Sequence, residues 1–385
     1  MSPAGAVDRI GPRFFGVDLS IDGGTVWPEF SPGVVRVALV WAGIETSPGK
    51  FQWASLDYKV EMAEANGARP MLVLQNTPEF HATGPSIPSA VSPPALRAYQ
   101  RFVRALVKRY GDRVDYQVWN EPSVPIFFNG TPKQMARMTK VVWRATRDLS
   151  TSAVVAPSFP LRIEMNRAWF TEYWRQRVNG RPVHRFVDVS NISAYPLPAG
   201  RPERALAITR WAQRVVDRAG FAGPMWISEV NYGANGLAPT RKIRPRLQAA
   251  YVVRTYALTA AEPDVDRVYW WRWEPHQTVN TTLQDGKGNL TRAGRAYGVV
   301  RGWLLGAKPK GCSASPQGIY TCRFRLRDGV RRYVYWKPAG RTRSVTAPTG
   351  ALSRTSTGGV TKAIVAGAKV RVTKSPTMVE VQRSR

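Results

Sequence analysis

The stretch "VDYQVWNEP", residues 114–122, joins a strand-like run to a polar ending. Residues 114–119 are rich in β-branched and aromatic side chains, which predicts a buried strand. Asn120, Glu121 and Pro122 follow directly. Pro122 cannot continue a central strand, so Glu121 is expected at a corner where the strand ends. A carboxylate in this position must be paired or have a chemical role, because burying an unpaired charge is costly.

Further strand-like segments occur on both sides of this stretch, and helical patterns follow almost every one of them. Such alternation predicts a parallel sheet covered by helices. Eight strands in a region of this length favour a (β/α)8 TIM barrel. The alternative is an open doubly wound sheet, which often has a glycine-rich phosphate turn that this sequence lacks. The other expected strands are 14–19, 34–41, 70–75, 153–158, 186–195, 224–230 and 265–273.

Two of the expected helices have clear sequence signals. Residues 94–111 place apolar side chains three and four apart, and Gly111 ends the pattern. Residues 131–143 begin with Thr131, Pro132 and, three positions after the threonine, a glutamine that completes a capping box. Further helices are expected at 55–66, 166–178, 202–218, 243–261 and 292–304.

The sequence pattern changes after residue 306. Helical periodicity stops, and short alternating runs separated by Gly, Pro, Ser and Thr predict a small antiparallel β-domain. We therefore expect a catalytic barrel over 1–306 and a basic, β-sandwich-like domain over 307–385. Residues 308–385 contain 17 Lys and Arg but only two acids, and so carry +15 of the chain's net charge of +30. This domain either caps the barrel or holds the protein on an anionic surface.

The charge of +30 is compatible with nucleic acid, an anionic membrane surface or an acidic glycan as partner. The positive residues are mostly scattered arginines, and no helix-turn-helix, zinc-finger or RNA-recognition signature is present. We therefore expect no specific nucleic-acid partner. Association with an anionic cell envelope or an acidic polysaccharide is one alternative, and non-specific adhesion of an arginine-rich surface to polyanions is the other.

The two cysteines, Cys312 and Cys322, are close enough in sequence to bridge a hairpin, although two free thiols are an alternative. A bridge would indicate an oxidising compartment, so we expect a secreted or cell-envelope protein. No signal peptide is visible at the N-terminus, and no apolar run is long enough to span a membrane. No metal is expected, because two Cys and three scattered His offer no ligand spacing, and no cofactor is needed for the chemistry below.

Two carboxylates are expected at the mouth of the barrel, where working residues sit at the carboxyl ends of strands. Glu121 ends the fourth strand, and Glu229 ends the seventh, "PMWISEV". Strands four and seven face one another, so the two side chains can act on opposite sides of one bond. Glycoside hydrolysis uses such a pair, about 5 Å apart in retaining enzymes.

"WNEP" after the fourth strand and "ISEVNYG" at the seventh resemble clan A of the glycoside hydrolases, for example families five, thirty-nine and fifty-one. The resemblance covers about residues 14–305. It implies that Glu121 is the general acid/base and Glu229 the nucleophile. It further implies that Asn120 hydrogen-bonds the sugar hydroxyl next to the reacting carbon.

The same resemblance assigns supporting residues on other strands. Arg36 matches the arginine that supports the nucleophile, and Tyr195 matches a tyrosine that contacts it, although "SAY" replaces the family's His-x-Tyr. Trp271 or Trp273 would form the floor under the sugar. Alternation along a strand lets only one of these two rings face the barrel.

Other polar residues fall at the same expected strand ends and loops. His81 and His276 can contact sugar hydroxyls or be incidental loop residues, and the same two alternatives hold for Asp18 and Glu274. Four acids compete with Glu229 for the second catalytic position: Asp18, Glu45, Glu79 and Glu274.

These observations predict a retaining glycoside hydrolase that cleaves a polysaccharide or oligosaccharide of cell-wall or extracellular origin. Pentose-containing glycans such as arabinan or xylan are favoured. The alternatives are a transglycosylase that uses the same glutamates, or a non-catalytic basic protein that binds carbohydrate or another polyanion.

Overall fold

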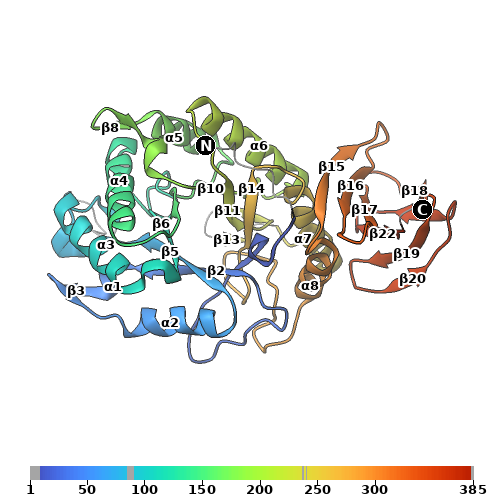
Figure 1. Cartoon of the computed structure of the whole chain (residues 1–385), viewed down its shortest axis with the longest axis horizontal. Helices are drawn as coiled ribbons and strands as arrows, with labels where there is room; N and C mark the ends of the chain where they lie inside the picture. The colour runs from blue at the N-terminus through green and yellow to red at the C-terminus, as the bar shows by residue number, and fades with distance from the viewer. Residues whose placement is uncertain (1–8, 85–90, 236–237, 240, 383–385) are drawn as a thin grey trace.

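The computed structural model describes residues 9–84, 91–235, 238–239 and 241–382. Residues 1–8, the start of the stretch in which the sequence shows no signal peptide, lie outside the described residues. Within them, eight parallel strands form the central sheet (Figure 1). The strands are β1 (Phe15–Asp18), β2 (Val34–Val40), β5 (Arg69–Gln75), β6 (Asp115–Gln117), β7 (Val154–Val155), β10 (Ser190–Ser193), β11 (Met225–Val230) and β14 (Val265–Trp270).

The sheet has the order β10-β11-β14-β1-β2-β5-β6-β7, and its two edges meet. A parallel bridge joins Val155 to Val189, next to β10. The Ala156 amide donates to the Val189 carbonyl at 2.9 Å, and the Ser193 amide donates to the Phe159 carbonyl at 3.0 Å. These bonds close the barrel, so the (β/α)8 fold expected from the sequence is confirmed.

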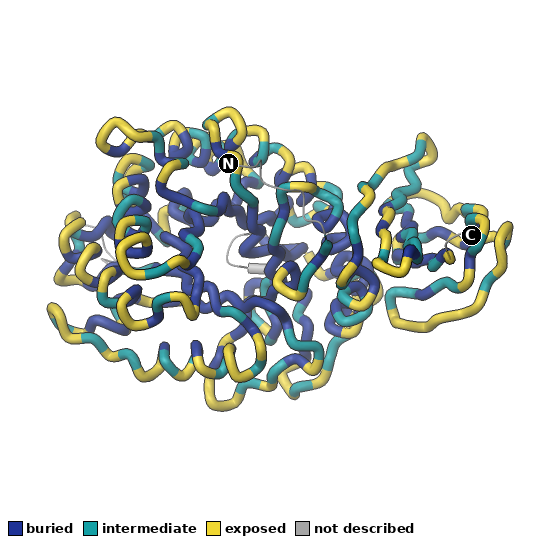
Figure 2. Tube along the Cα trace, viewed as in Figure 1, coloured by how far each residue is buried: buried dark blue, intermediate teal, exposed yellow. Residues whose placement is uncertain are grey.

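Helices surround the barrel, and each one buries an apolar side against the strands. In Figure 2 the tube is mostly buried along the strands and exposed along the outer sides of the helices. Helix α4 begins with the expected capping box, in which Thr131 and Gln134 bond to each other's backbone N–H. The helices are α1 (Trp41–Ile44), α2 (Ala54–Ala65), α3 (Leu96–Tyr110), α4 (Pro132–Leu149), α5 (Glu164–Arg175), α6 (Pro202–Arg218), α7 (Pro245–Thr259) and α8 (Arg292–Leu304).

Short elements decorate the loops between strands and helices. They form three small antiparallel hairpins and several single turns of 3₁₀ helix among the described residues. The hairpins are β3 (Glu45–Ser47) with β4 (Lys50–Phe51), β8 (Arg177–Val178) with β9 (Arg181–Pro182), and β12 (Ala234–Asn235) with β13 (Ala238–Pro239). The 3₁₀ turns are Pro12–Phe14, Glu79–His81, Gly111–Arg113 and Val183–Phe186.

The C-terminal part is an antiparallel β-domain that lies beside α7 and α8 (Figure 1). Its described strands form a six-stranded sheet and a two-stranded sheet. The chain passes from α8 to the first of these strands over residues 305–307. The larger sheet contains β15 (Lys308–Ala314), β16 (Tyr320–Arg325), β17 (Arg331–Trp336), β22 (Thr377–Val381), β19 (Ala351–Ser356) and β20 (Thr361–Ala363), and the smaller contains β18 (Arg343–Thr346) and β21 (Lys369–Val372).

The larger sheet is covered on both faces. Side chains alternate along each strand, so neighbouring residues pack on opposite faces. Phe324, Val334 and Trp336 belong to the same hydrophobic cluster as the barrel and its helices. Tyr335 and Val379 point the other way and pack with residues of β18 and β21. The expected disulfide, Cys312–Cys322, joins β15 to β16 on the barrel side.

Hydrogen bonds reinforce the contact between the β-domain and the barrel. The Trp336 indole N–H donates to Glu203 of α6 at 2.8 Å, and Glu203 also pairs with Arg254 of α7. Arg332 donates to the carbonyls of Gly302 and Trp303 in α8 at 3.0 and 2.9 Å. The two parts therefore share a continuous core with directional bonds around it.

Candidate active site

Arg36, on β2, lies at the centre of a buried polar cluster formed by the carboxyl ends of several strands. Its Nη1 donates to Asp18 Oδ2 of β1 at 2.6 Å. Its Nη2 donates to Asn120 Oδ1 at 2.8 Å and pairs with Glu229 Oε1 of β11 at 2.6 Å. One guanidinium therefore holds together side chains from three other parts of the barrel.

The cluster is almost closed to solvent, so its charges interact strongly. Arg36 is only 5% exposed. Burial disfavours its charged form, but the carboxylates of Glu229 and Asp18 overcome this effect and keep the pKa of Arg36 above its usual value. The arginine is therefore a permanent cation between two acids.

Glu229 has partners that favour its ionised form. The Tyr195 hydroxyl, just after β10, donates to Glu229 Oε2 at 2.7 Å, while Arg36 pairs with the other oxygen. Burial raises the pKa of Glu229, and the charge of Arg36 and the hydrogen bond from Tyr195 oppose that rise. A carboxylate held on both oxygens has a fixed orientation.

Glu121 lies at the predicted corner after β6, and its surroundings differ from those of Glu229. Its backbone φ of 38° lies in the left-handed region, which is strained for a non-glycine residue. Its amide donates to Ser158 Oγ at 3.2 Å, which holds the corner in place. Among the described residues, no hydrogen-bond partner reaches its buried Oε1. Burial, together with the charge of Glu229, raises the pKa of Glu121 to about 8.

The two glutamates belong to one site. Asn120 and Glu121 are consecutive, and a single nitrogen of Arg36 contacts both Asn120 and Glu229. The charge of Glu229 also contributes to the raised pKa of Glu121, which requires proximity in a poorly screened environment. Burial raises the pKa of both acids, and at Glu229 the ion pair with Arg36 and the hydrogen bond from Tyr195 oppose that rise.

Arg162, in the loop after β7, also belongs to this site and was not expected from the sequence. Its guanidinium lies 5.6 Å from the centre of the Tyr195 ring, and its Nη1 donates to the Ala234 carbonyl at 2.9 Å. Its charge acts to lower the pKa of both Glu121 and Glu229. No motif or periodicity distinguishes this residue from the many other arginines of the chain.

The structure separates the two candidate tryptophans. The Trp271 ring meets the Tyr195 ring edge-on at 6.3 Å and the His276 ring at 5.1 Å, so it lies beside the tyrosine that donates to Glu229. Trp273 is 1% exposed, packs on Phe30 and donates its indole N–H to the Val26 carbonyl. The structure therefore places Trp273 in the core and not beside the glutamates.

Asp18 and Glu274 line the other side of the site together with Arg272. Arg272 lies 3.9 Å from Asp18 and 3.2 Å from Glu274. Burial, partly offset by the charge of Arg272, raises the pKa of Glu274 to about 7, and its Oε1 accepts from the Ser20 amide at 2.9 Å. A cavity of about 640 Å³ opens here, with Asp18, Arg36 and Arg272 in its lining.

His81 belongs to a different network. Its Nε2 lies 3.0 Å from Glu45 Oε1, and its ring stacks on Trp41. Glu45 also accepts from the Trp41 indole N–H at 2.7 Å and from the Gly49 amide at 2.7 Å. These partners engage Glu45 and connect His81 to the β3–β4 hairpin and α1, not to the Arg36 cluster.

The chemistry available here is that of carboxylates, hydroxyls and aromatic rings. Among the described residues, no group of three or more His, Cys, Asp and Glu side chains is arranged to hold a metal ion. No helix in the described part of the chain has the length and apolar character needed to cross a bilayer.

Several solved structures resemble this chain closely in fold. A family 39 glycoside hydrolase from Bacteroides cellulosilyticus WH2 superposes with a TM-score of 0.75 at 15% identity, covering 98% of this chain and 82% of that one. A GH30 endoxylanase from Clostridium papyrosolvens C71 gives 0.65 at 14% identity, with 99% and 98% covered. Endo-glycoceramidase II from Rhodococcus sp. gives 0.51 at 15% identity, with both chains fully covered, 100% and 100%.

No protein-family model matches the sequence, and no curated protein matches it either. The structural likeness is therefore carried by the arrangement of elements and not by overall sequence identity. It extends over nearly the whole chain, β-domain included. The chain has the fold of the clan A glycoside hydrolases.

Proposed function

We propose that this protein is a retaining glycoside hydrolase, with Glu229 as nucleophile and Glu121 as general acid/base. The observation that carries the proposal is the position of Arg36, which contacts both Glu229 and the residue next to Glu121. Double displacement at a glycosidic bond needs a carboxylate nucleophile and a carboxylic acid, and here one buried glutamate is held by a cation while the pKa of the other is raised to about 8.

In the first step, Glu229 attacks the anomeric carbon while the bond to the leaving oxygen breaks. Glu121 gives its proton to that oxygen, so the departing alcohol is neutral and the sugar is esterified to Glu229. The raised pKa of Glu121, about 8, keeps the proton available at neutral pH. Arg36 and Tyr195 orient the attacking carboxylate.

In the second step, water attacks the anomeric carbon and the ester to Glu229 breaks. Esterification removes the negative charge of Glu229, which is one cause of the raised pKa of Glu121. The pKa of Glu121 therefore falls in the intermediate, and its carboxylate accepts the proton from water. The same residue serves as acid and then as base.

Neighbouring side chains complete the proposed sugar site. Asn120 accepts from Arg36 through Oδ1, so its amide NH₂ remains free to donate to the hydroxyl next to the anomeric carbon. Trp271 offers a ring for an apolar sugar face. Asp18 lines the cavity, and Glu274 pairs with Arg272 of the same lining, so both carboxylates are placed to bond to sugar hydroxyls.

We further propose a wall or extracellular polysaccharide as substrate, with pentose-containing glycans such as xylan favoured. An endoxylanase is among the proteins with this fold. The disulfide, and an exported Bacteroides fragilis protein of similar fold, support action outside the cytoplasm. Residues 1–306 would form the catalytic domain, and 307–385 the second domain.

A screen of wall polysaccharides and aryl glycosides, with Glu229→Gln as the inactive control, tests this function. Once the screen identifies an aryl glycoside substrate, its 2-deoxy-2-fluoro analogue is incubated with the protein. This analogue should leave a sugar attached to the peptide that contains Glu229. Mass spectrometry of the digested protein locates that adduct. Attachment to another residue, or full activity of Glu229→Gln, would contradict the assignment.

A further inference from the structure

Two adjoining cavities between the barrel and the β-domain form what we call the basic groove. Their volumes are about 570 and 400 Å³, and Arg246 and Arg371 line both. No Asp or Glu lines either cavity. The cations of the basic groove are Arg244, Arg246, Arg292, Arg295, Lys337, Arg341, Arg354, Arg371 and Lys374.

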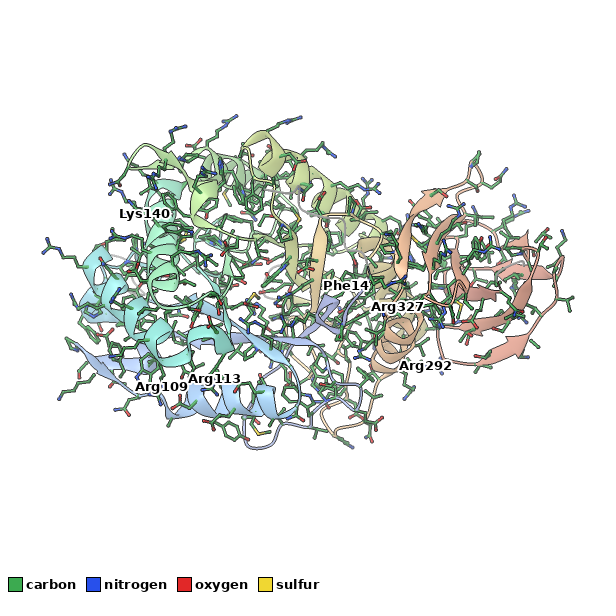
Figure 3. The ribbon with its side chains drawn as sticks, viewed as in Figure 1. Phe14, Arg109, Arg113, Lys140, Arg292 and Arg327 are labelled. Atoms are coloured by element: carbon green, nitrogen blue, oxygen red, sulfur yellow. A yellow bond between two sulfur atoms is a disulfide. The ribbon has the colours of Figure 1, made fainter. Side chains whose placement is uncertain are left out.

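The cations of the basic groove lack carboxylate partners. None of them forms a salt bridge within the described part of the chain, and Arg295 and Lys337 bond only to backbone carbonyls. Elsewhere on the barrel, surface arginines are often paired. Arg109 and Arg113, labelled in Figure 3, bind Asp57 and Glu64 at 2.5 and 2.6 Å. What distinguishes the basic groove from the surface around Arg109 and Arg113 is that nine cations line it together, with no Asp or Glu among its described lining residues.

The groove also coincides with the starts of two helices. Arg244 is the N-cap of α7 and Arg246 lies in its first turn, while Arg292, labelled in Figure 3 beside the β-domain, begins α8. Neither first turn contains an acid. The positive end of a helix dipole disfavours cations, so this arrangement costs stability unless an anion is bound. The dipoles and side chains together produce one strongly positive surface.

The shape and lining of the groove restrict the anion that fits it. Both cavities are concave, which suits a polymer chain better than the flat surface of a bilayer. Ser356, Thr357, Thr373 and Ser375 supply hydroxyls that can bond to sugar hydroxyls and acidic groups. No aromatic ring lines either cavity, whereas single-stranded nucleic acid is usually held by stacking on aromatic side chains.

We infer that the basic groove binds an acidic polysaccharide through its carboxylate groups. Helix α7 follows β11, which carries Glu229, and α8 follows β14. Helices of a (β/α)8 barrel begin at the end where the strands finish, so the groove opens at the same end as the candidate active site. The groove is nevertheless separate from the cluster around Arg36, and its binding does not depend on the proposed reaction.

Binding of polygalacturonate to the full chain tests this inference. The Glu229→Gln variant serves as background, so that no turnover interferes and a failure here is distinct from a failure of the proposed function. In this Glu229→Gln background, the double substitution Arg246→Gln and Arg371→Gln should weaken polygalacturonate binding by about tenfold, because two charge-assisted contacts are lost. A matched pair on the far side of the barrel, Arg97→Gln and Arg101→Gln of α3, should change it by no more than about twofold, since only long-range attraction is reduced.

Three results would overturn the inference. Equal weakening by the two pairs would mean that the chain attracts polyanions without a defined site. Equal affinity for a neutral polysaccharide such as dextran would remove the role of charge. If DNA or anionic lipid vesicles bind more tightly than polygalacturonate, and the Arg246→Gln/Arg371→Gln variant loses that binding, the groove would be assigned to a different polyanion. Thermal melting of each variant checks that it remains folded.

Discussion

Arg36 divides its terminal nitrogens among Asp18, Asn120 and Glu229. A lysine could not reproduce this pattern, because the planar guanidinium offers several donors in fixed directions. The arrangement also explains why Glu121 and Glu229 differ in their electrostatic surroundings. Glu229 lies on the cation, whereas Glu121 is buried beside it without a salt bridge among the described residues.

The effect of replacing Glu121, the proposed general acid, should depend on the leaving group. Glu121→Ala should slow glycosides with poor leaving groups by about 10²–10⁴-fold, the usual contribution of general acid catalysis. Activated aryl glycosides should lose much less in the first step, because their leaving groups need no proton. Steady-state kinetics on a series of aryl substrates provides the measurement. Equal losses along the series would contradict the acid role.

The raised pKa of Glu121 should also appear in the pH dependence of stability. The unfolded chain loses this proton near pH 4–5, about its ordinary pKa. The folded chain keeps it until about pH 8. Between these values the folded state binds more protons, so the free energy of unfolding falls as pH rises.

Glu121→Gln removes this penalty and should stabilise the protein by about 1–3 kcal/mol at pH 8, with little effect at pH 4. Urea denaturation at both pH values measures the difference. Glu79→Gln, at an exposed position in the loop after β5, is the control for replacing a surface carboxylate by an amide. A gain for Glu121→Gln that is the same at both pH values would contradict the raised pKa.

Single residues were predictable where a strand pattern pointed to them. Glu121, Glu229 and Arg36 stand at or within recognisable strands, so the barrel topology alone brings them to one end. Arg162 lies in a loop whose path follows from tertiary contacts, and nothing in the sequence marks it. Trp273 illustrates another limit, because the sequence does not show which of two alternate rings turns toward the core.

At the scale of elements, most helices were predicted within three residues, but α4 continues to Leu149, beyond its predicted end at 143, and α1 was not expected. Some strands are shorter than expected. The segment expected at 153–158 is a strand only over Val154–Val155. Beyond Val155, side chains replace part of the backbone hydrogen bonding between β7 and β10. For example, Asn191 Nδ2 donates to the Ala156 carbonyl at 3.2 Å. The hairpins within the loops were not expected, because two- and three-residue strands have no detectable periodicity.

The start of α4 offers a test at this scale. Thr131→Ala removes the capping-box hydroxyl that accepts from the Gln134 amide, and should cost about 1 kcal/mol of stability. Thr131→Ser keeps the hydroxyl and should cost little. Equilibrium urea denaturation of both variants distinguishes the cap from simple loss of side-chain volume. Equal destabilisation by alanine and serine would contradict the capping role.

At the scale of the whole molecule, the six-stranded sheet is shared between two cores. Alternate residues of β17 pack toward the barrel and toward β18 and β21. The sequence predicted a β-domain from its alternating runs, but not this docking, which depends on the surfaces of α6, α7 and α8. The basic groove likewise arises only when two surfaces, each positive by itself, are brought together.

Trp336 should therefore matter to the barrel as well as to the β-domain. Trp336→Ala leaves a cavity between them and frees Glu203 from a hydrogen bond, with an expected loss of about 3–5 kcal/mol. Leu352→Ala, at a side chain that is 43% exposed in the same domain, is the control and should cost far less. Calorimetry should show one transition shifted as a unit. A separate β-domain transition, with the barrel unchanged, would contradict the shared core.

The order in which the ribosome makes this chain determines when the Arg36 cluster can form. Asp18 and Arg36 emerge early, Asn120 follows, and Glu229 arrives only with the seventh barrel strand. A nascent chain lacking that strand cannot complete the set of partners around the guanidinium. Under the proposed function, activity is therefore a late event in biosynthesis, and an N-terminal fragment that stops short of β11 is expected to be inactive.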